Sequence, residues 1–164
     1  MNADRLAQVR LVAFDVDGVF TDGRFYLSDD GVESKAFNTQ DGFGVRQLIE
    51  AGVSVAVISG RASGAVEHRM QELRVPFVVL ACRDKVAALE NIIAQLGITP
   101  AECAFVGDDI PDLAALEYAG VSIAVANATP HLLQSCDVTT QACGGAGAVR
   151  EVCDMLLAAR GAKA

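Results

Sequence analysis

Four groups of polar residues recur at points where an apolar run of the sequence ends. They are the pair Asp15 and Asp17, the triplet Ser59-Gly60-Arg61, the single Lys85 and the triplet Gly107-Asp108-Asp109. If the apolar runs are parallel strands of an α/β sheet, their carboxyl ends meet at one edge, where such folds bind ligands. We therefore expect these groups, which are far apart in the sequence, to converge on one cleft.

The carboxylates in this set favour a metal site. Their oxygens are hard donors, which suit Mg²⁺ better than a soft metal. Carboxylates that crowd together at neutral pH also need a cation to offset their repulsion. Two of them, Asp109 and Asp112, could orient metal-bound water or Lys85, or could cap the following helix. The predicted magnesium ligands are Asp15, Asp17 and Asp108, with Asp109 and Asp112 in support.

The same residues suit phosphoryl transfer. Asp15 could attack phosphorus and form an aspartyl-phosphate. Asp17, two residues further on, lies on the same side if the strand continues, and could protonate the leaving oxygen and then deprotonate the hydrolytic water. Ser59 and Lys85 would hold the transferring oxygens, with Lys85 neutralising negative charge. The set predicts a magnesium-dependent phosphatase with the catalytic residues Asp15, Asp17, Ser59 and Lys85.

Short apolar runs alternate with stretches of helical spacing along the chain. The runs are continuous or rich in β-branched residues, as in a parallel sheet covered on both faces. They span Val9–Phe14, Val53–Ile58, Phe77–Leu80, Cys103–Val106 and Val121–Val125. The helical stretches span Gly42–Ala51, Ala62–Leu73, Lys85–Leu96, Asp112–Ala119 and Ala148–Ala159. The alternation predicts a doubly wound α/β fold.

One segment, at about residues 20–37, interrupts the alternation. Arg24–Leu27 and Val32–Phe37 have the composition of short strands, and Ser28-Asp29-Asp30-Gly31 between them contains the Asp-Gly pair typical of hairpin turns. The predicted β-hairpin follows the first strand and precedes the first helix. Its edges need a cover, which self-association would supply. A solvated flap is the alternative.

Composition excludes several classes of function. The 164 residues fit one domain, 1–164. The formal net charge of −8 argues against a general nucleic-acid binder, which needs a basic surface. No apolar run approaches the ~20 residues that span a bilayer, and the N-terminus lacks the pattern of a signal peptide. We therefore expect a cytoplasmic protein without a membrane or nucleic-acid partner.

The four polar groups together resemble the four motifs of the haloacid dehalogenase superfamily of phosphatases. The matching residues are Asp15-Val16-Asp17-Gly18-Val19, Ser59, Lys85 and Gly107-Asp108-Asp109-Ile110-Pro111-Asp112. The resemblance covers nearly the whole chain and implies a Rossmann-like fold, Mg²⁺ dependence and an aspartyl-phosphate intermediate. It also implies that Asp15 and Asp108 bind the metal by their side chains, and Asp17 through its backbone carbonyl.

Further stretches resemble a capless branch of that superfamily, which dephosphorylates an eight-carbon acid sugar for lipopolysaccharide synthesis in Gram-negative bacteria. The branch resemblance implies a homotetramer, in which the hairpin joins a central barrel and neighbouring subunits help to close each active site. The matching stretches are Asp15–Gly23, Lys35-Ala36-Phe37-Asn38, Asp41-Gly42-Phe43-Gly44, Ile58-Ser59-Gly60-Arg61, Gly144-Gly145, Gly147-Ala148-Val149-Arg150-Glu151 and Cys153-Asp154.

The same resemblance places a set of residues around the sugar phosphate. Arginine offers a fork of donors for the substrate carboxylate, while amide and backbone groups suit its hydroxyls. Arg61 and Arg69 are eight residues apart and are expected to share one helix and roughly one face. The full set comprises Asp17, Asn38, Thr39, Gln40, Asp41, Gly42, Arg46, Gly60, Arg61, Arg69 and Lys85.

Two positions bear on the choice of substrate. Ala146 stands where the usual pattern of the branch has an Arg, so a contact to the sugar carboxylate could be missing. Arg61 favours the eight-carbon sugar, because related phosphatases of nine-carbon acid sugars tend to have Glu there. A nine-carbon acid sugar phosphate, or a broader range of phosphomonoesters, is the alternative substrate. A catalytically silent assembly module is the non-enzymatic alternative, against which the intact motif residues argue.

Overall fold

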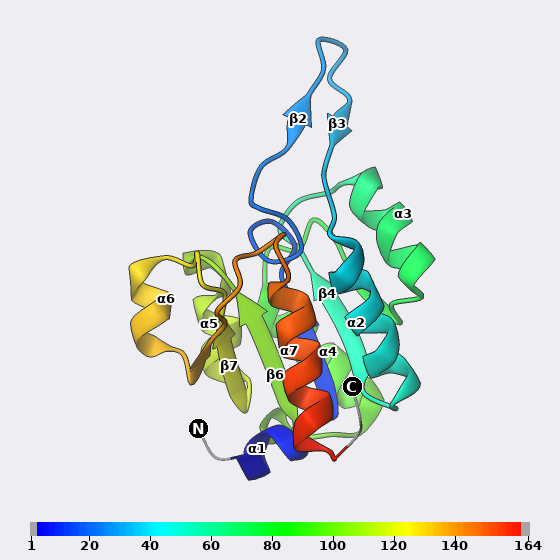
Figure 1. The fold of residues 1–164 in the computed structure, drawn as a ribbon. Coiled ribbons are helices and arrows are strands. Elements are labelled where there is room, and N and C mark those ends of the chain that lie inside the picture. Colours follow the sequence, from blue (N-terminus) through cyan, green and yellow to red (C-terminus); the bar gives the residue numbers. More distant parts are fainter. Residues whose placement is uncertain (1–2, 162–164) are drawn as a thin grey trace.

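A six-stranded parallel sheet forms the centre of the protein in the computed structural model, which describes residues 3–161 (Figure 1). The strand order is β5-β4-β1-β6-β7-β8, and the neighbours in it pair in parallel. The strands span Phe77–Val79 (β5), Ser54–Ile58 (β4), Leu11–Phe14 (β1), Cys103–Gly107 (β6), Val121–Ala124 (β7) and Val138–Thr139 (β8). This arrangement confirms the predicted doubly wound α/β class.

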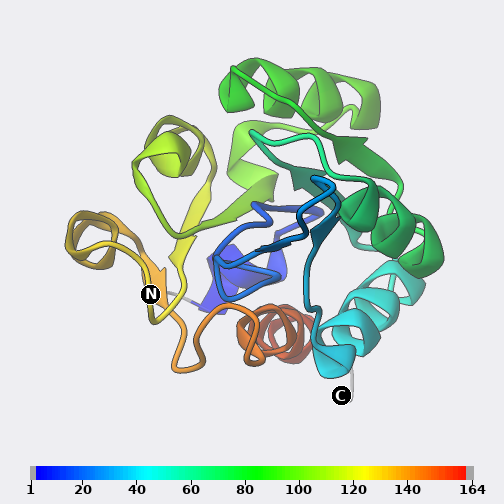
Figure 2. The same cartoon turned by 90° about the horizontal axis from the view of Figure 1, so that it is seen from above.

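Helices cover both faces of the sheet. Figure 2 shows α2 and α7 side by side on one face, with α4 and α5 on the opposite face. The strands are thus buried on both sides, which explains their continuously apolar sequences. The helices span Ala3–Ala7 (α1), Thr39–Glu50 (α2), Gly64–Leu73 (α3), Lys85–Leu96 (α4), Leu113–Tyr118 (α5), Pro130–Ser135 (α6) and Ala148–Ala159 (α7), with 3₁₀ helices at Pro100–Glu102 (η1) and Ile110–Asp112 (η2).

The core is centred on β1. All four residues of Leu11–Phe14 are 0% exposed, because β1 lies between β4 and β6 in the middle of the sheet. The ring of Phe14 packs edge-on against that of Phe20, with 5.4 Å between the centroids, and so ties the strand to the loop that follows it. The strand order reverses at β1, which makes the crevice beyond its carboxyl end the natural place for a ligand.

The other predicted elements are present with shifted ends. Helix α2 begins at Thr39, before the predicted start at Gly42, because the Asn38 side chain accepts a hydrogen bond from the Gln40 N–H (2.8 Å) and caps the helix. Helix α3 begins at Gly64, so the expectation that Arg61 shares a helix with Arg69 is wrong. The predicted helix 112–119 is divided between η2 and α5, and the short elements α1, α6 and β8 were not predicted.

The predicted hairpin is present, but its paired strands are short. Strand β2 (Tyr26–Leu27) pairs antiparallel with β3 (Glu33–Ser34). The Ser28 N–H donates to the Val32 carbonyl oxygen (3.0 Å) and closes the turn. Figure 1 shows the hairpin rising away from the body of the molecule, above the edge where the parallel strands end. Its exposed apolar side chains are Phe25, Tyr26, Leu27 and Val32.

Within residues 3–161, each helix is either too short or too polar to cross a bilayer.

Candidate active site

The chain leaves β1 at Asp15 and turns sharply. The Asp15 N–H donates to the Val106 carbonyl oxygen (2.9 Å), which extends the pairing between β1 and β6 by one residue. The Val16 carbonyl then accepts hydrogen bonds from the N–H groups of Phe20 (2.9 Å) and Thr21 (3.2 Å). These bonds fold the following loop into a compact turn. Asp15 itself is 8% exposed and lines a cleft of about 320 Å³.

This cleft contains the four polar groups that the sequence separates. They come from the carboxyl ends of β1, β4 and β6 and from the first residue of α4, all at one edge of the sheet. The cleft is therefore the candidate active site. It is lined by Asp15, Asp17, Gly23, Ser59, Gly60, Arg61, Lys85, Asp108, Asp109, Pro111 and Asp112.

Lys85 links two carboxylates across the cleft. Its Nζ lies 2.8 Å from Asp15 Oδ1 and 2.6 Å from Asp112 Oδ1, and the residue is 8% exposed. Asp84 fixes the start of α4 by accepting a hydrogen bond from the Ala87 N–H (3.0 Å), so Lys85 emerges from a well-defined helix end. Burial alone would lower the pKa of Lys85, but Asp15 and Asp112 raise it, which keeps the ammonium charged beside Asp15.

The two supporting aspartates have different surroundings. Asp112 is 1% exposed, and its Oδ2 accepts a hydrogen bond from the Asp108 N–H (3.0 Å) while its Oδ1 holds Lys85. Asp109 accepts a hydrogen bond from the Ile110 N–H (2.8 Å) at the start of η2. Asp112 is thus placed to orient Lys85, and Asp109 caps the start of η2.

Asp17 has cations on both carboxylate oxygens. The Lys35 ammonium contacts Asp17 Oδ1, and Arg61 Nε lies 3.7 Å from Asp17 Oδ2. Ser59, on the loop after β4, is 2% exposed, and its Oγ accepts a hydrogen bond from the Arg61 N–H (3.3 Å). Both residues line the cleft, with the Asp17 side chain 23% exposed and Ser59 buried.

Glycines allow two segments to approach the catalytic loop closely. Gly18 has a φ of +93°, and a Cβ there would collide with the Asp108 carboxylate. A Cβ on Gly144 would in turn collide with the main chain of Gly18. The Gly144 N–H donates to Asn127 Oδ1 (2.6 Å), which holds this second loop in place. The loop before α7 therefore packs directly on the loop that carries Asp15.

Comparison with known proteins identifies the family. A family model described as haloacid dehalogenase-like hydrolase matches residues 81–149. The 3-deoxy-D-manno-octulosonate 8-phosphate phosphatase KdsC of Escherichia coli K12 is 42% identical over 164 residues, which cover 98% of this chain and 87% of the relative. The chain belongs to the KdsC family of haloacid dehalogenase-like hydrolases.

Solved structures of KdsC-family proteins have the same fold. The phosphatase from Yersinia pestis superimposes with a TM-score of 0.95 at 41% identity, covering 97% of this chain and 86% of that one. The enzyme from Moraxella catarrhalis, solved in complex with a magnesium ion, a phosphate ion and a KDO molecule, has a TM-score of 0.94 at 39% identity, covering 97% of this chain and 91% of that one. The predicted family resemblance is confirmed.

The acidic residues of this KdsC-family cleft fit a magnesium ion. One carboxylate oxygen from each of Asp15, Asp108 and Asp112 lies within 4.8 Å of the others. Both oxygens of Asp112 already have protein partners, which leaves Asp15 and Asp108 as the more available side-chain ligands. Hard oxygen donors of this kind suit Mg²⁺. When bound, the cation would neutralise charge on the nucleophile and on the phosphoryl oxygens.

The electrostatics of the cleft also favour the binding of a cation. Burial, followed by the nearby Asp112, raises the pKa of Asp15 to about 6. Burial, followed by Asp15, Asp112 and Asp109, raises the pKa of Asp108 to about 7. One lysine is not enough to offset these carboxylates, and a divalent cation would lower both pKa values again.

Without metal, this repulsion should make stability depend on pH. Between about pH 4, where an unfolded Asp ionises, and about pH 7, the native protein binds more protons at Asp15 and Asp108 than the unfolded chain, so their contribution to stability falls as pH rises. We expect the metal-free protein to lose stability relative to Asp108→Asn over this range, as measured by urea unfolding in chelator. A pH-independent difference between the two proteins would contradict the result, and Mg²⁺ should remove the trend at neutral pH.

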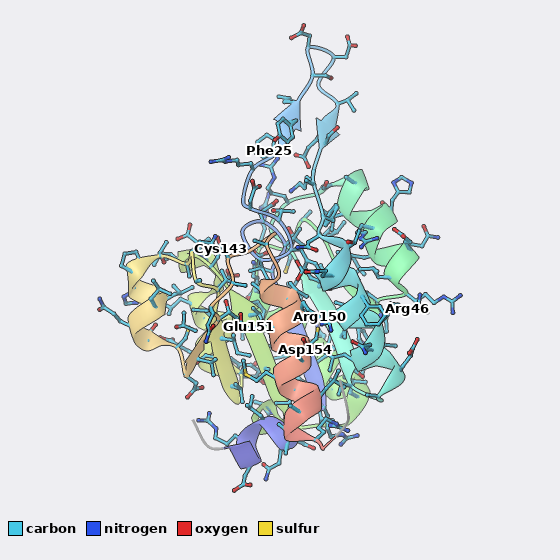
Figure 3. The ribbon with its side chains drawn as sticks, viewed as in Figure 1. Phe25, Arg46, Cys143, Arg150, Glu151 and Asp154 are labelled. Atoms are coloured by element: carbon cyan, nitrogen blue, oxygen red, sulfur yellow. The ribbon has the colours of Figure 1, made fainter. Side chains whose placement is uncertain are left out.

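Part of the predicted substrate set lies outside the cleft within one chain. Figure 3 shows Arg46 on α2 in the helical body, apart from Phe25 on the hairpin. Arg46 and Arg69 form ion pairs with neighbours on their own helices, Glu50 (3.7 Å) and Glu72 (2.8 Å). The separate groove between α2 and α3 is lined by Thr39, Gly42, Phe43, Arg46, Arg69, Glu72 and Leu73. Contact between this groove and a substrate remains a prediction.

Three further members of that set, Asn38, Gln40 and Asp41, have structural contacts at the start of α2. Asn38 caps the helix by binding the Gln40 N–H. Asp41 is 1% exposed and accepts a hydrogen bond from the Arg150 N–H at the start of α7 (2.8 Å). Burial raises the pKa of Asp41 despite the hydrogen bonds that it accepts from the backbone of α7. Asp41 therefore joins α2 to α7, whatever further role it has toward a substrate.

Two contacts of the site involve residues that the sequence did not predict as site residues. One is Lys35, which touches Asp17, and the other is the packing of Gly144 on Gly18. Both positions lie in stretches that carry the family resemblance, so their motif match was the available signal.

Proposed function

We propose that this protein hydrolyses 3-deoxy-D-manno-octulosonate 8-phosphate (KDO 8-phosphate) to KDO and inorganic phosphate, with Mg²⁺ as cofactor and Asp15 as the covalent nucleophile. The observation that carries the proposal is the similarity, over 97% of the chain, to an enzyme solved with magnesium, phosphate and KDO. The cleft supports it, because Asp15, Lys85 and Asp108 are placed for phosphoryl transfer. An intact cleft of this kind argues against a silent assembly module.

In the first half-reaction, a carboxylate oxygen of Asp15 attacks phosphorus and forms an acyl-phosphate bond. The bond from phosphorus to the O8 oxygen of the sugar breaks, and Asp17 donates a proton to that oxygen. Lys85 stabilises the negative charge on the phosphoryl oxygens, since its Nζ is 2.8 Å from the attacking carboxylate. The Ser59 hydroxyl would donate a hydrogen bond to the same oxygens, since it lines the cleft.

In the second half-reaction, water attacks the phosphorus of the aspartyl-phosphate. Asp17, now deprotonated, takes a proton from that water, and the phosphorus–Asp15 bond breaks to release phosphate. Asp17 regains the proton that it donated in the first step, so the enzyme returns to its starting state. Asp17 lines the cleft and its side chain is partly exposed, which suits access to both the leaving group and the entering water.

The substrate assignment can be tested with a panel of phosphate esters. Purified protein with Mg²⁺ should show a kcat/KM for KDO 8-phosphate at least ~100-fold above that for simple sugar phosphates, because its guanidinium groups can pair with the carboxylate. Arg61 lines the cleft, and its side chain is 48% exposed and available for that pairing. Similar kcat/KM values across the panel would contradict the proposal.

A nine-carbon acid sugar phosphate is the second candidate. Ala146 favours it, because it lies in the exposed part of the loop before α7 and cannot supply a cationic contact to the eight-carbon sugar. A clear preference for the longer sugar in the same panel would support this candidate. Replacement of Ala146 by Arg should then improve kcat/KM for KDO 8-phosphate in particular.

The hairpin supports the further proposal of a homotetramer with shared active sites. Phe25, Tyr26, Leu27 and Val32 are 43%, 70%, 64% and 63% exposed. The ladder of the hairpin has two residue pairs, which is too small to be stable alone. A central barrel built from these hairpins would bury them. The same assembly could bring the groove between α2 and α3 of one subunit toward the cleft of a neighbour, which would complete the predicted substrate set.

Disruption of the hairpin should reduce both assembly and activity. We expect the double variant Tyr26→Ser/Leu27→Ser to have a smaller mass by light scattering and a kcat/KM at least ~10-fold lower, since apolar contact area is lost and a neighbour no longer completes the site. Leu133→Ser, an exposed apolar residue on α6, is the matched control. An unchanged mass in the double variant would contradict the shared-site proposal.

We also propose a cytoplasmic location, where the product would enter lipopolysaccharide synthesis. The cysteines support this compartment: Cys82, Cys103, Cys136, Cys143 and Cys153 are all free thiols, as is usual in a reducing environment.

A further inference from the structure

The side chain of Lys35 is buried at the base of the hairpin. The residue follows β3 directly, and its side chain is 0% exposed. Its ammonium contacts the Asp17 carboxylate and lies 3.6 Å from Glu33 Oε1. A lysine is rarely buried without a carboxylate partner, because removing its charge from water is unfavourable. Here the partner is the residue proposed as the general acid and base.

Lys35 belongs to a network that joins the hairpin to the loop after β4. Glu33 on β3 accepts hydrogen bonds from the Ser63 hydroxyl (2.8 Å) and from Arg61 (2.6 Å), and these bonds lower the pKa of Glu33, so it stays ionised. The Arg61 guanidinium also lies 4.3 Å from the centre of the Phe25 ring. The hairpin base and the loop after β4 are thus tied together on the two sides of Asp17.

The two carboxylate oxygens of Asp17 have different contacts in this network. Oδ1 is in direct contact with the buried Lys35 side chain, whereas Oδ2 is 3.7 Å from Arg61, whose half-exposed side chain lines the cleft. The first contact restricts rotation of the carboxylate, whereas the longer distance to Arg61 leaves Oδ2 less tightly held. A carboxyl group that protonates the leaving oxygen of the substrate and later deprotonates the hydrolytic water gains most from such a fixed orientation.

We infer that Lys35 is a positioning residue for Asp17: it holds Oδ1 so that Oδ2 is the oxygen that exchanges protons with the leaving group and the hydrolytic water. This inference rests on the proposed phosphatase function. It also connects the hairpin to the chemistry, because Lys35 and Glu33 both belong to the hairpin base.

The test compares substrates that differ in their need for a proton. Lys35→Met keeps the apolar stem and removes the cation, and Lys35→Arg keeps the cation. With enzyme in excess, so that only the first half-reaction is followed, Lys35→Met should slow the cleavage of KDO 8-phosphate by about 100-fold. It should slow that of p-nitrophenyl phosphate less than about threefold, because nitrophenolate leaves without protonation. Lys35→Arg should restore most of the loss on the sugar phosphate.

A double-mutant cycle gives an independent readout. In an Asp17→Asn background, Lys35→Met should add less than about twofold, because the residue through which it acts is already disabled. Arg24→Met removes an exposed cation from the same hairpin and should leave both substrates unaffected. Thermal unfolding and light scattering of each variant establish that fold and assembly are retained.

Equal losses on the two substrates, or a full additive loss in the Asp17→Asn background, would overturn the inference and leave Lys35 a structural role alone. If KDO 8-phosphate is not hydrolysed at all, the proposed function fails separately. Phenyl phosphate, a poorer leaving group than the nitrophenyl ester, then takes its place in the same comparison, so the role of Lys35 is still decided.

Discussion

Asp15→Asn should lower kcat by at least ~10⁴-fold while the protein remains folded and assembled. The amide has nearly the shape of the carboxylate but is a very poor nucleophile toward phosphorus. Metal-free stability should be equal to or above that of the natural protein, because the substitution removes one of the crowded carboxylates whose repulsion, with burial, raises the pKa values of Asp15 and Asp108. Steady-state kinetics and urea unfolding measure the two effects.

Asp29→Asn is the matched control for this variant. Asp29 lies in the exposed turn of the hairpin, so the same change of charge there should leave kcat and stability close to those of the natural protein. Activity of Asp15→Asn within tenfold of the natural protein would refute the nucleophile assignment, whatever the substrate proves to be.

Lys85→Met should impair both catalysis and folding. The substitution leaves Asp15 and Asp112 buried without the cation that now lies 2.8 Å and 2.6 Å from them, and breaking a buried ion pair from one side typically costs about 3–5 kcal/mol. The loss of charge stabilisation at the phosphoryl oxygens should lower kcat by about 10³-fold. Metal-free urea unfolding and phosphate release are the measurements, and Mg²⁺ should restore stability in part but not kcat.

Arg83→Met serves as the control for Lys85→Met. Arg83 is exposed two residues earlier in the chain, and its loss should change stability by less than about 0.5 kcal/mol. If Lys85→Met were as stable as Arg83→Met and retained more than a tenth of the natural kcat, Lys85 would not be the central cation of the site.

The fold was predictable where the sequence pattern reflects burial on both faces of a sheet. The apolar runs that became β1, β4 and β6 are almost entirely buried, so their composition identifies them as strands of a covered parallel sheet. Strand β8 and helix α6 follow no such pattern. Strand β8 has two residues, one of them the exposed Thr139, and α6 has a single buried side chain, Leu132. Elements with so little buried surface leave little trace in the hydrophobic periodicity.

Some residues of the candidate site were also predictable from the sequence pattern, and others were not. Asp15, Ser59 and Asp108 were predictable because the carboxyl ends of parallel strands meet at one edge of the sheet, and Lys85 because it opens the helix that follows β5. No sequence pattern assigns a role to Lys35, because its burial against Asp17 depends on how the hairpin packs on the loop after β4. Asp41 was placed with the substrate residues, yet its hydrogen bond goes to α7, which lies far along the chain. Contacts of this kind join segments that are far apart in the sequence, so local sequence patterns do not predict them.

The most direct test of the central claim is to trap the covalent intermediate. Protein and KDO 8-phosphate with Mg²⁺ would be mixed, quenched in acid within one turnover, digested and examined by peptide mass spectrometry. The mechanism predicts a transient phosphoryl group on the peptide that contains Asp15, formed no later than the first phosphate release and absent from Asp15→Asn. Release of phosphate at the normal rate with no phosphoryl group on that peptide at any time would contradict it.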